Sequence, residues 1–385
     1  MRLANSYFVI TALVSHWVLA GCSTSSPKPT TTTTDASGTG GSSACSGGSA
    51  ELPPFGDFTV SLVPASQGAR GSGENPAYTD IIGQIYDGPT PEPVIETKLP
   101  APSDATPGCA VFSEAPANCA NIGGCGIGSS IASCAAAAPT GVNTCVCVAL
   151  DTCQAYPTNK NAGAVTVSGI TDTSGETTFQ LVNNSNAYQL PATTTIPYPG
   201  FAEGDNITLS AGCGDYAPFE ISAKGVAPLH LTNGPPFNIA KAPSSADAGA
   251  DSGANTYPFQ AFTITWDPPG PASTSRIQLQ MDLTHHAGSI GHLACDVDDT
   301  GSLTVSSGLV SQLIGLGHIA GYPELDVTRS TSGSIETAQG AINLVIQSSI
   351  IAPDLTIDGY ISCTRATDCP SGQACNSATK LCQPA

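Results

Sequence analysis

Apolar and polar residues alternate with a period of two through much of the chain after Ala164. The segments with this pattern are 165–170, 206–209, 219–223, 229–231, 262–266, 277–283, 293–297 and 303–305. Successive side chains of a strand point to opposite faces of a sheet, so this period is typical of strands with one buried face. Turns rich in Asn, Gly and Pro separate the segments. The pattern predicts a mainly β protein with an antiparallel β-sandwich, Ig-like in general architecture.

One segment departs from this period. Leu309, Val310, Leu313 and Ile314 recur at helical spacing after Ser306. We expect a short helix that begins near Ser306 and stops at a glycine, either residue 315 or residue 317.

The N-terminus has the three parts of a secretory signal: Arg2, an apolar stretch from Tyr7 to Ala20, and a small-residue exit. The stretch is too short to span a bilayer, which needs about 20 apolar residues. The exit Leu19-Ala20-Gly21-Cys22 resembles the lipobox of bacterial lipoproteins. This resemblance implies that Cys22 becomes an acylated N-terminus, carrying palmitate or similar chains. We therefore expect a lipid-anchored protein of the cell envelope, in the outer membrane.

The charge of the chain limits its partners. Lys and Arg number 11 against 30 Asp and Glu, for a formal net charge of −19. Such a surface repels phosphate backbones, so nucleic acid is excluded as a partner. Charged residues make up 11% of the chain, below the quarter or so that is usual. Ser, Thr, Gly and Asn must therefore cover much of the surface, which suits an exported β protein.

The 15 cysteines indicate an oxidising compartment. Without the lipid site Cys22 an even number remains, and no two are spaced C-x-x-C, so structural disulfides are expected. The candidates are Cys45, Cys109, Cys119, Cys125, Cys134, Cys145, Cys147, Cys153, Cys213, Cys295, Cys363, Cys369, Cys375 and Cys382. The cluster from Cys109 to Cys153 has seven members, so at least one bridge must leave it, and Cys45 is the first candidate partner.

Composition predicts five consecutive parts. They are a signal peptide at 1–21, a flexible Ser-, Thr- and Gly-rich tether at 22–50, a Pro-, Gly- and Cys-rich module stapled by disulfides at 51–160, the sandwich at 161–362 with a possible linker at 244–255, and a Cys-rich knob at 363–385.

The knob should be held by two local bridges. Cys363 to Cys382 encloses four cysteines separated by five, five and six residues, with almost no apolar side chains for a core. The alternative is a bridge from Cys363 to Cys295, which would join the knob to the sandwich.

Three segments are similar to extracytoplasmic lipoproteins of predatory, gliding Gram-negative bacteria. They are Trp266–Gly270, Cys295–Ser302 and Asp368–Cys375. The resemblance implies a surface or periplasmic setting and supplies no activity.

An acidic turn is a candidate calcium site. Asp296, Asp298 and Asp299 precede Gly301, and calcium takes several carboxylate oxygens in a flexible turn. An EF-hand calcium loop is excluded, because Ser307 occupies the position where the bidentate Glu is required. The competing interpretation is a plain hairpin turn between two strands, with no cofactor.

Three histidines near Cys295 also suggest a metal. His285, His286 and His292 lie close together in sequence. Strand phase argues against a shared site, because His285 continues the inward face of its strand while the other two flank a turn. Solvated or capping histidines are favoured over transition-metal ligands.

Five aromatic residues in the first half of the sandwich offer rings for a glycan platform: Tyr188, Tyr198, Phe201, Tyr216 and Phe219. Core filling explains most aromatics in such strands and is the favoured interpretation.

Catalytic motifs give no support for an enzyme. No Ser has Gly at both −2 and +2, and H-E-x-x-H and P-loop patterns are absent. We predict a non-enzymatic adhesion or recognition module for a glycan or protein ligand. A cell-envelope hydrolase with a triad assembled from distant residues and a structural spacer are the alternatives.

Overall fold

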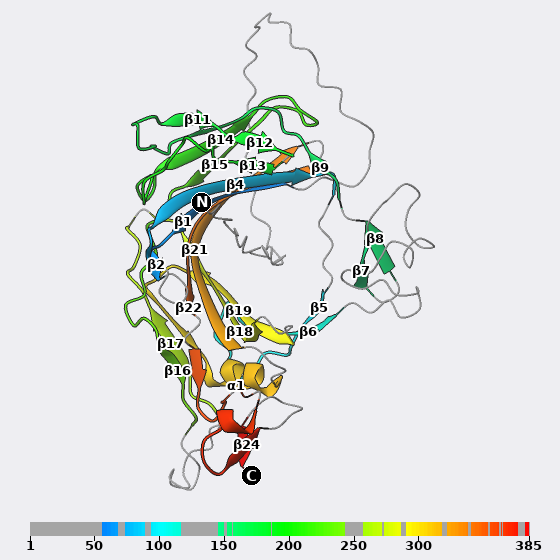
Figure 1. The fold of residues 1–385 in the computed structure, drawn as a ribbon, viewed down its shortest axis with the longest axis vertical. Helices are drawn as coiled ribbons and strands as arrows, with labels where there is room; N and C mark the ends of the chain where they lie inside the picture. The colour runs from blue at the N-terminus through cyan, green and yellow to red at the C-terminus, as the bar shows by residue number, and fades with distance from the viewer. Residues whose placement is uncertain are drawn as a thin grey trace, which may run out of the picture. The chain divides into compact units, whose positions relative to one another are not determined.

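A strongly curved eleven-stranded sheet organises the computed structural model of the protein (Figure 1). In spatial order its strands are β12 (Val182–Asn184), β13 (Ala187–Gln189), β4 (Tyr78–Tyr86), β1 (Gly56–Val63), β22 (Gly340–Ala352), β21 (Tyr322–Thr337), β18 (Arg276–His285), β19 (Gly291–Asp298), β6 (Cys109–Pro116) and β5 (Val94–Lys98), with β9 (Asn159–Lys160) paired to β4. All these pairs are antiparallel except β1 with β22.

The structure describes one compact unit within Cys45–Ala385. The described residues are 56–67, 74–88, 94–116, 145–149, 152–155, 157–185, 187–242, 257–271, 273–285, 290–317, 322–337, 340–352, 355–361, 363, 365–375 and 382–384. The expected signal peptide, tether and linker therefore lie outside them. None of the described helices is both long enough and apolar enough to cross a bilayer.

The remaining described strands form smaller sheets. The four-stranded sheet has the order β11 (Thr178–Gln180), β10 (Val165–Ser168), β14 (Asn206–Ala211) and β15 (Phe219–Lys224). The two-stranded sheets are β16 (Phe237–Ile239) with β23 (Leu355–Ile357), β17 (Phe262–Thr265) with β20 (Ser302–Val305), β2 (Ser66–Gln67) with β3 (Glu74–Asn75), β7 (Cys145–Ala149) with β8 (Thr152–Ala155), and β24 (Gln373–Cys375) with β25 (Cys382–Pro384). With mostly antiparallel sheets packed in layers, the predicted mainly β, sandwich-type class is confirmed.

The outer, convex face of the large sheet is buried in two apolar cores. In the first, Phe58 and Val60 of β1 pack with Val167 and Leu209 of the four-stranded sheet. This is the sandwich proper, and Figure 1 shows β11, β14 and β15 of the four-stranded sheet outside the curve of β1 and β4. Alternate residues of β15 are buried and exposed along its whole length, as the period of two predicts.

The second core lies under the other half of the large sheet. Ile277, Leu279, Met281 and Leu283 of β18 are buried there together with Trp266. The alternation in 262–266 and 277–283 predicts one buried face for each segment, and the structure confirms it.

The expected helix also packs on the second core. α1 spans Ser307–Gly315, and the Ser306 side chain caps it by accepting a hydrogen bond from the Leu309 backbone nitrogen at 3.4 Å. The four apolar residues at helical spacing are all buried. The predicted start and stop are therefore confirmed.

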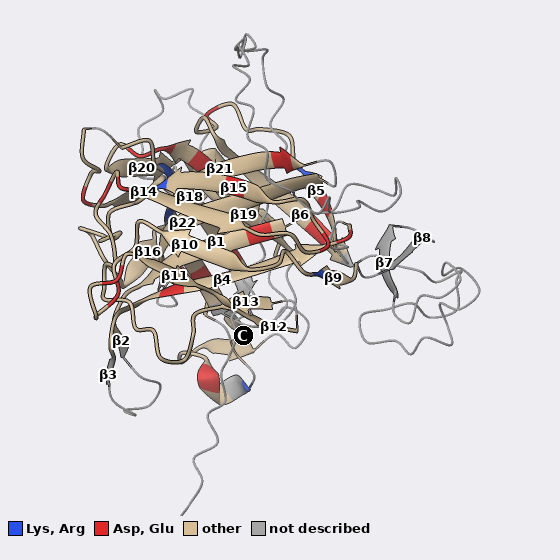
Figure 2. Cartoon of the chain, turned by 90° about the horizontal axis from the view of Figure 1, so that it is seen from above, with Lys and Arg blue, Asp and Glu red and all other residues tan. Residues whose placement is uncertain are grey.

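The inner, concave face of the large sheet is polar. Ser61, Gln278, Ser330 and Asn343 alternate with the buried residues of their strands and are exposed or half-buried. Acidic positions recur across the strands of this sheet while basic ones are few (Figure 2). The two faces therefore have opposite chemistry: one holds the apolar cores and the other offers hydrogen-bonding groups.

The described residues within 51–160 do not form the separate module that their composition predicts. They supply β1, β4, β5 and β6 to the same sheet as the strands beyond residue 161. β1 pairs in parallel with β22, which lies near the other end of the chain. The predicted boundary at residue 160 therefore divides a single structural unit. The prediction failed because local composition carries no signal of such long-range pairing.

A long-range disulfide joins this early segment to the rest. Cys109 on β6 is bonded to Cys295 on β19, and the two residues are directly opposite in register with a Cα–Cα distance of 4.0 Å. A bridge does leave the Cys109–Cys153 cluster, as expected, but this one goes to Cys295. Cys45 and the side chains of the other cluster members lie outside the described residues, whereas Cys213 is disulfide-bonded.

The tail forms its two bridges locally, as predicted. Cys363 is bonded to Cys375 and Cys369 to Cys382. Strands β24 and β25 and the 3₁₀ turn Ala366–Asp368 are the other elements among the described residues of the knob. The alternative bridge from Cys363 to Cys295 is not formed, because Cys295 already pairs with Cys109.

Candidate ligand-binding site

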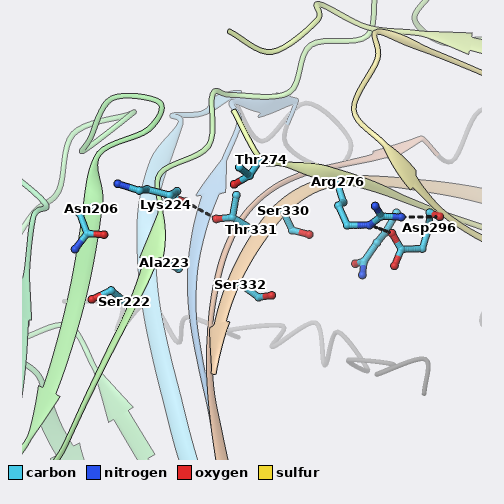
Figure 3. A pocket seen from close by; sticks show the side chains of 11 residues that line it. Asn206, Ser222, Ala223, Lys224, Thr274, Arg276, Asp296, Ser330, Thr331 and Ser332 are labelled. Atoms are coloured by element: carbon cyan, nitrogen blue, oxygen red, sulfur yellow. Dashed lines mark hydrogen bonds and ion pairs between the residues drawn. The ribbon is translucent and has the colours of Figure 1, made fainter. Parts of the chain in front are cut away.

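A polar pocket lies at a step in the edge of the large sheet. Pairing of β18 with β21 ends at Arg276 and Ser330, whereas β21 continues beside β22 as far as Thr337. The seven residues 331–337 therefore extend past the end of β18. We call the pocket at this step the notch pocket; its volume is about 370 Å³. It is lined by Asn206, Ser222, Ala223, Lys224, Thr274, Arg276, Gln278, Asp296, Ser330, Thr331 and Ser332 (Figure 3).

Strand β15 forms one wall by crossing the extension of β21 at close range. A Cβ atom on Gly333 would lie 2.0 Å from the backbone oxygen of Ser222, so only glycine permits this approach. The Thr331 hydroxyl donates a hydrogen bond to the backbone oxygen of Lys224. These contacts fix β15, and with it the side chains of Ser222 and Lys224, beside the pocket.

A fixed cation forms the opposite wall. The Nε atom of Arg276 lies 2.5 Å from Asp296 and its Nη1 atom 2.7 Å from Asp298. The hydrogen bond to Asp296, with the charges of both carboxylates, raises the pKa of Arg276 above its ordinary value. Arg276 is therefore always charged here, and the two carboxylates hold its planar group in one orientation.

Neutral hydrogen-bonding groups fill the space between the two walls. Gln278, Ser330 and Ser332 are at least partly exposed, and Figure 3 shows Ser330 and Ser332 on β21 between Lys224 and Arg276. Amide and hydroxyl groups both donate and accept hydrogen bonds. The pocket is thus suited to a ligand that carries several hydroxyl groups.

The three candidate calcium ligands are not brought together. Asp296 and Asp298 bond Arg276 at the inner face, whereas Asp299 points to the opposite side into the second core. There Asp299 accepts hydrogen bonds from Trp266 Nε1 at 2.6 Å, from the Ser275 hydroxyl at 2.7 Å and from Arg329 Nε at 2.6 Å.

The turn that carries Asp299 is also not the plain hairpin that was considered. β19 pairs with β18 and β6, whereas β20 pairs with β17, so the chain leaves one sheet for another at this turn. Gly301 has a φ of 91°, which suits a glycine at such a turn.

The histidines do not form a shared site among the described residues. His292 is the second residue of β19; it is buried, and its Nδ1 atom lies 2.6 Å from a carboxylate oxygen of Glu114. His285 ends β18, and its side chain and His286 lie outside the described residues. No sequence pattern indicates the Glu114 contact, because the two residues are far apart in the chain.

The five aromatic candidates for a glycan platform belong to the first core. Tyr188, Phe201, Tyr216 and Phe219 are buried, and Tyr198 packs against them. The core-filling interpretation is therefore right, and the alternative interpretation of a surface platform of these rings is wrong.

Sequence patterns did not single out Lys224 or Arg276 as residues of a binding site. The scarcity of basic residues in the chain was the one signal that could have indicated them.

No protein-family model matches the chain, and a search of curated proteins found no significant match.

Proposed function

We propose that the protein is a lipid-anchored recognition protein of the cell envelope that binds a glycan in the notch pocket. The observation that carries this proposal is the chemistry of the lining. The chain has 11 Lys and Arg residues in all, and two of them, Lys224 and Arg276, line one pocket together with six Ser, Thr, Asn or Gln residues other than Thr331. Sugar hydroxyls need such closely spaced donors and acceptors.

The position of the pocket supports the same proposal. Strands from distant parts of the chain fix its walls, so binding would not require the ordering of a loop, which lowers the entropic cost of association. The expected lipid anchor and tether would hold this rigid body at the membrane while leaving it accessible to envelope polysaccharides or to those of other cells.

A glycan array probed with the full lipoprotein in detergent tests the binding. Gln278→Ala removes an exposed amide from the pocket, and we expect it to weaken binding of the selected glycan by roughly tenfold. Gln180→Ala, on the exposed side of β11, is the matched control and should bind normally. Equal binding by both variants, or binding to no glycan, would contradict the proposal, and release of shortened sugars would favour the hydrolase.

The anchor is tested separately. Thioether attachment needs the thiol of Cys22, so Cys22→Ala should abolish metabolic lipid labelling and move the protein out of the detergent phase. Unchanged labelling and partitioning would rule out this anchor and leave the glycan site untouched.

A further inference from the structure

Three side chains of types that commonly bind metal ions converge at the far edge of the inner face. Glu96 of β5 is directly opposite Glu114 of β6, and His292 comes from β19, the next strand. The Nδ1 atom of His292 lies 2.6 Å from an oxygen of Glu114 and 3.7 Å from an oxygen of Glu96. One potential ligand atom from each of the three lies within 4.8 Å of the others.

These separations fit a shared ion. Zinc takes nitrogen and oxygen ligands at about 2.1 Å in a tetrahedral arrangement, which places neighbouring ligand atoms about 3.4 Å apart. The two distances from His292 lie on either side of this value. Small side-chain rotations would therefore complete the geometry without moving the strands.

Burial makes a cation favourable at this position. The side chains of His292, Glu114 and Glu96 are 5%, 10% and 17% exposed. Like charges directly opposite in an antiparallel pair are destabilising, and their repulsion grows as water is removed. A divalent ion placed among the three side chains would offset the charge of both carboxylates.

The histidine ring is already oriented toward the carboxylates. It stacks on Phe112 with a centroid distance of 5.2 Å and an interplanar angle of 17°. Phe112 is opposite His292 in the β6–β19 pair, so strand register holds the stack in place. The ring therefore presents Nδ1 to the two carboxylates without a search among rotamers.

We propose that Glu96, Glu114 and His292 bind a divalent transition-metal ion, with zinc the best match to one imidazole and two carboxylates. Three protein ligands leave a fourth position for water or for a ligand atom.

Zinc titration of the full lipoprotein tests the site. The protein is first treated with a chelator and then with an alkylating agent, so that no cysteine thiol remains as a competing ligand. Calorimetry should show one zinc ion bound per chain. Glu114→Gln should weaken zinc binding by at least roughly tenfold. His230→Gln is the matched control, because His230 is an exposed histidine bonded to Asp267 at 3.1 Å.

A second variant keeps the test decisive if the substitution of a buried residue causes misfolding. Glu96→Gln alters the most exposed of the three ligands and should also weaken binding, with an unchanged circular dichroism spectrum. Cobalt should give visible absorption bands that both Glu variants lose. An absence of zinc binding, or equal zinc affinity in His230→Gln and the two Glu variants, would overturn the proposal. The three side chains would then form only an ion-pair cluster.

Discussion

Asp299 shows how one carboxylate can connect several parts of the fold. Its side chain and that of Arg329 are each 1% exposed. The Arg329 Nη2 atom also donates to the backbone oxygen of Asp267 at 2.6 Å. The pair therefore joins β21 to the turn after Trp266 and to the turn before β20. A buried ion pair of this kind is costly to leave half-formed, because the remaining charge has no compensation.

Asp299→Asn should accordingly lower the free energy of unfolding by about 3–5 kcal/mol. Urea denaturation followed by Trp266 fluorescence measures this loss, since the other tryptophan is Trp17 in the expected signal peptide. Asp298→Asn is the neighbouring control; its side chain is 85% exposed, so the loss should stay below about 1 kcal/mol. Similar losses in both variants would show that the buried pair has no special role.

Gly83 permits an aromatic contact over the middle of β4. It is opposite Phe58 on one neighbouring strand and Tyr188 on the other, and these rings lie 5.7 Å apart. A Cβ atom on Gly83 would lie 2.0 Å from the Phe58 ring.

Gly83→Ala should therefore destabilise the protein by about 1–3 kcal/mol through overpacking of the first core. A Cβ atom on Gly315, at the end of α1, would have no neighbouring atom within 4 Å, so Gly315→Ala should be neutral or stabilising by up to about 1 kcal/mol. Thermal denaturation of the two variants compares them directly. A tolerated alanine at residue 83 would mean that Phe58 can move aside at little cost.

Asp326, on the inner face, should make the stability of the protein depend on pH. Burial, with a smaller contribution from the charge of Glu324, raises the pKa of Asp326 to about 6. The folded state then holds a proton more tightly than the unfolded state. This contribution to stability is complete below about pH 4 and is lost as the pH rises through about 6.

Asp326→Asn should thus be more stable than the wild type at pH 7, by up to about 3 kcal/mol, and the difference should vanish near pH 3. The amide oxygen can still accept the hydrogen bond from Thr328. Urea titrations across this pH range measure the effect, and Glu220→Gln on the exposed side of β15 controls for loss of a strand carboxylate. A difference that does not change with pH would contradict the assignment.

At the scale of elements, β5 and β6 depend on one neighbour for attachment. β6 pairs with β5 and β19, and β5 forms the edge of the sheet. The Cys109–Cys295 bond closes a sequence separation of 186 residues, so it strongly restricts the unfolded chain.

Cys109→Ala combined with Cys295→Ala should lower the free energy of unfolding by roughly 3–5 kcal/mol. Amide hydrogen exchange should quicken first in β5 and β6. Removal of Cys369 and Cys382 is the control, because their separation is only 13 residues, and it should affect the knob alone. Unchanged exchange in β5 and β6 would show that strand pairing suffices.

Sequence reasoning succeeded where a signal is local and failed where it is not. The buried face of β18, the burial of Trp266, the cap at Ser306 and the bridges of the knob follow from spacing over a few residues. By contrast, β1 also pairs with β22 and β6 also pairs with β19, and Cys295 of β19 is 186 residues beyond Cys109 of β6. No local pattern selects such distant partners among the possible strands.

The candidate sites escaped sequence reasoning for the same reason. The notch pocket is lined by polar positions of β14, β15, β18, β19 and β21, each of which looks like an ordinary solvent-facing residue of a strand. Glu96, Glu114 and His292 likewise meet through register and curvature. Both sites are properties of the assembled sheet.

At the scale of the whole molecule, the pairing of β1 with β22 sets an order of events during synthesis. β1 emerges among the first segments, but its parallel partner includes Ile342 and Leu344 and emerges among the last. Until then the apolar side chains of Phe58, Val60 and Leu62 lack part of their final core. If the chain is exported in an unfolded state, most of it must cross the membrane before β22 can pair with β1. Until then β1 has an unpaired edge, and such an edge favours aggregation. An exported chain of this kind is therefore expected to depend on chaperones more than its final stability would suggest.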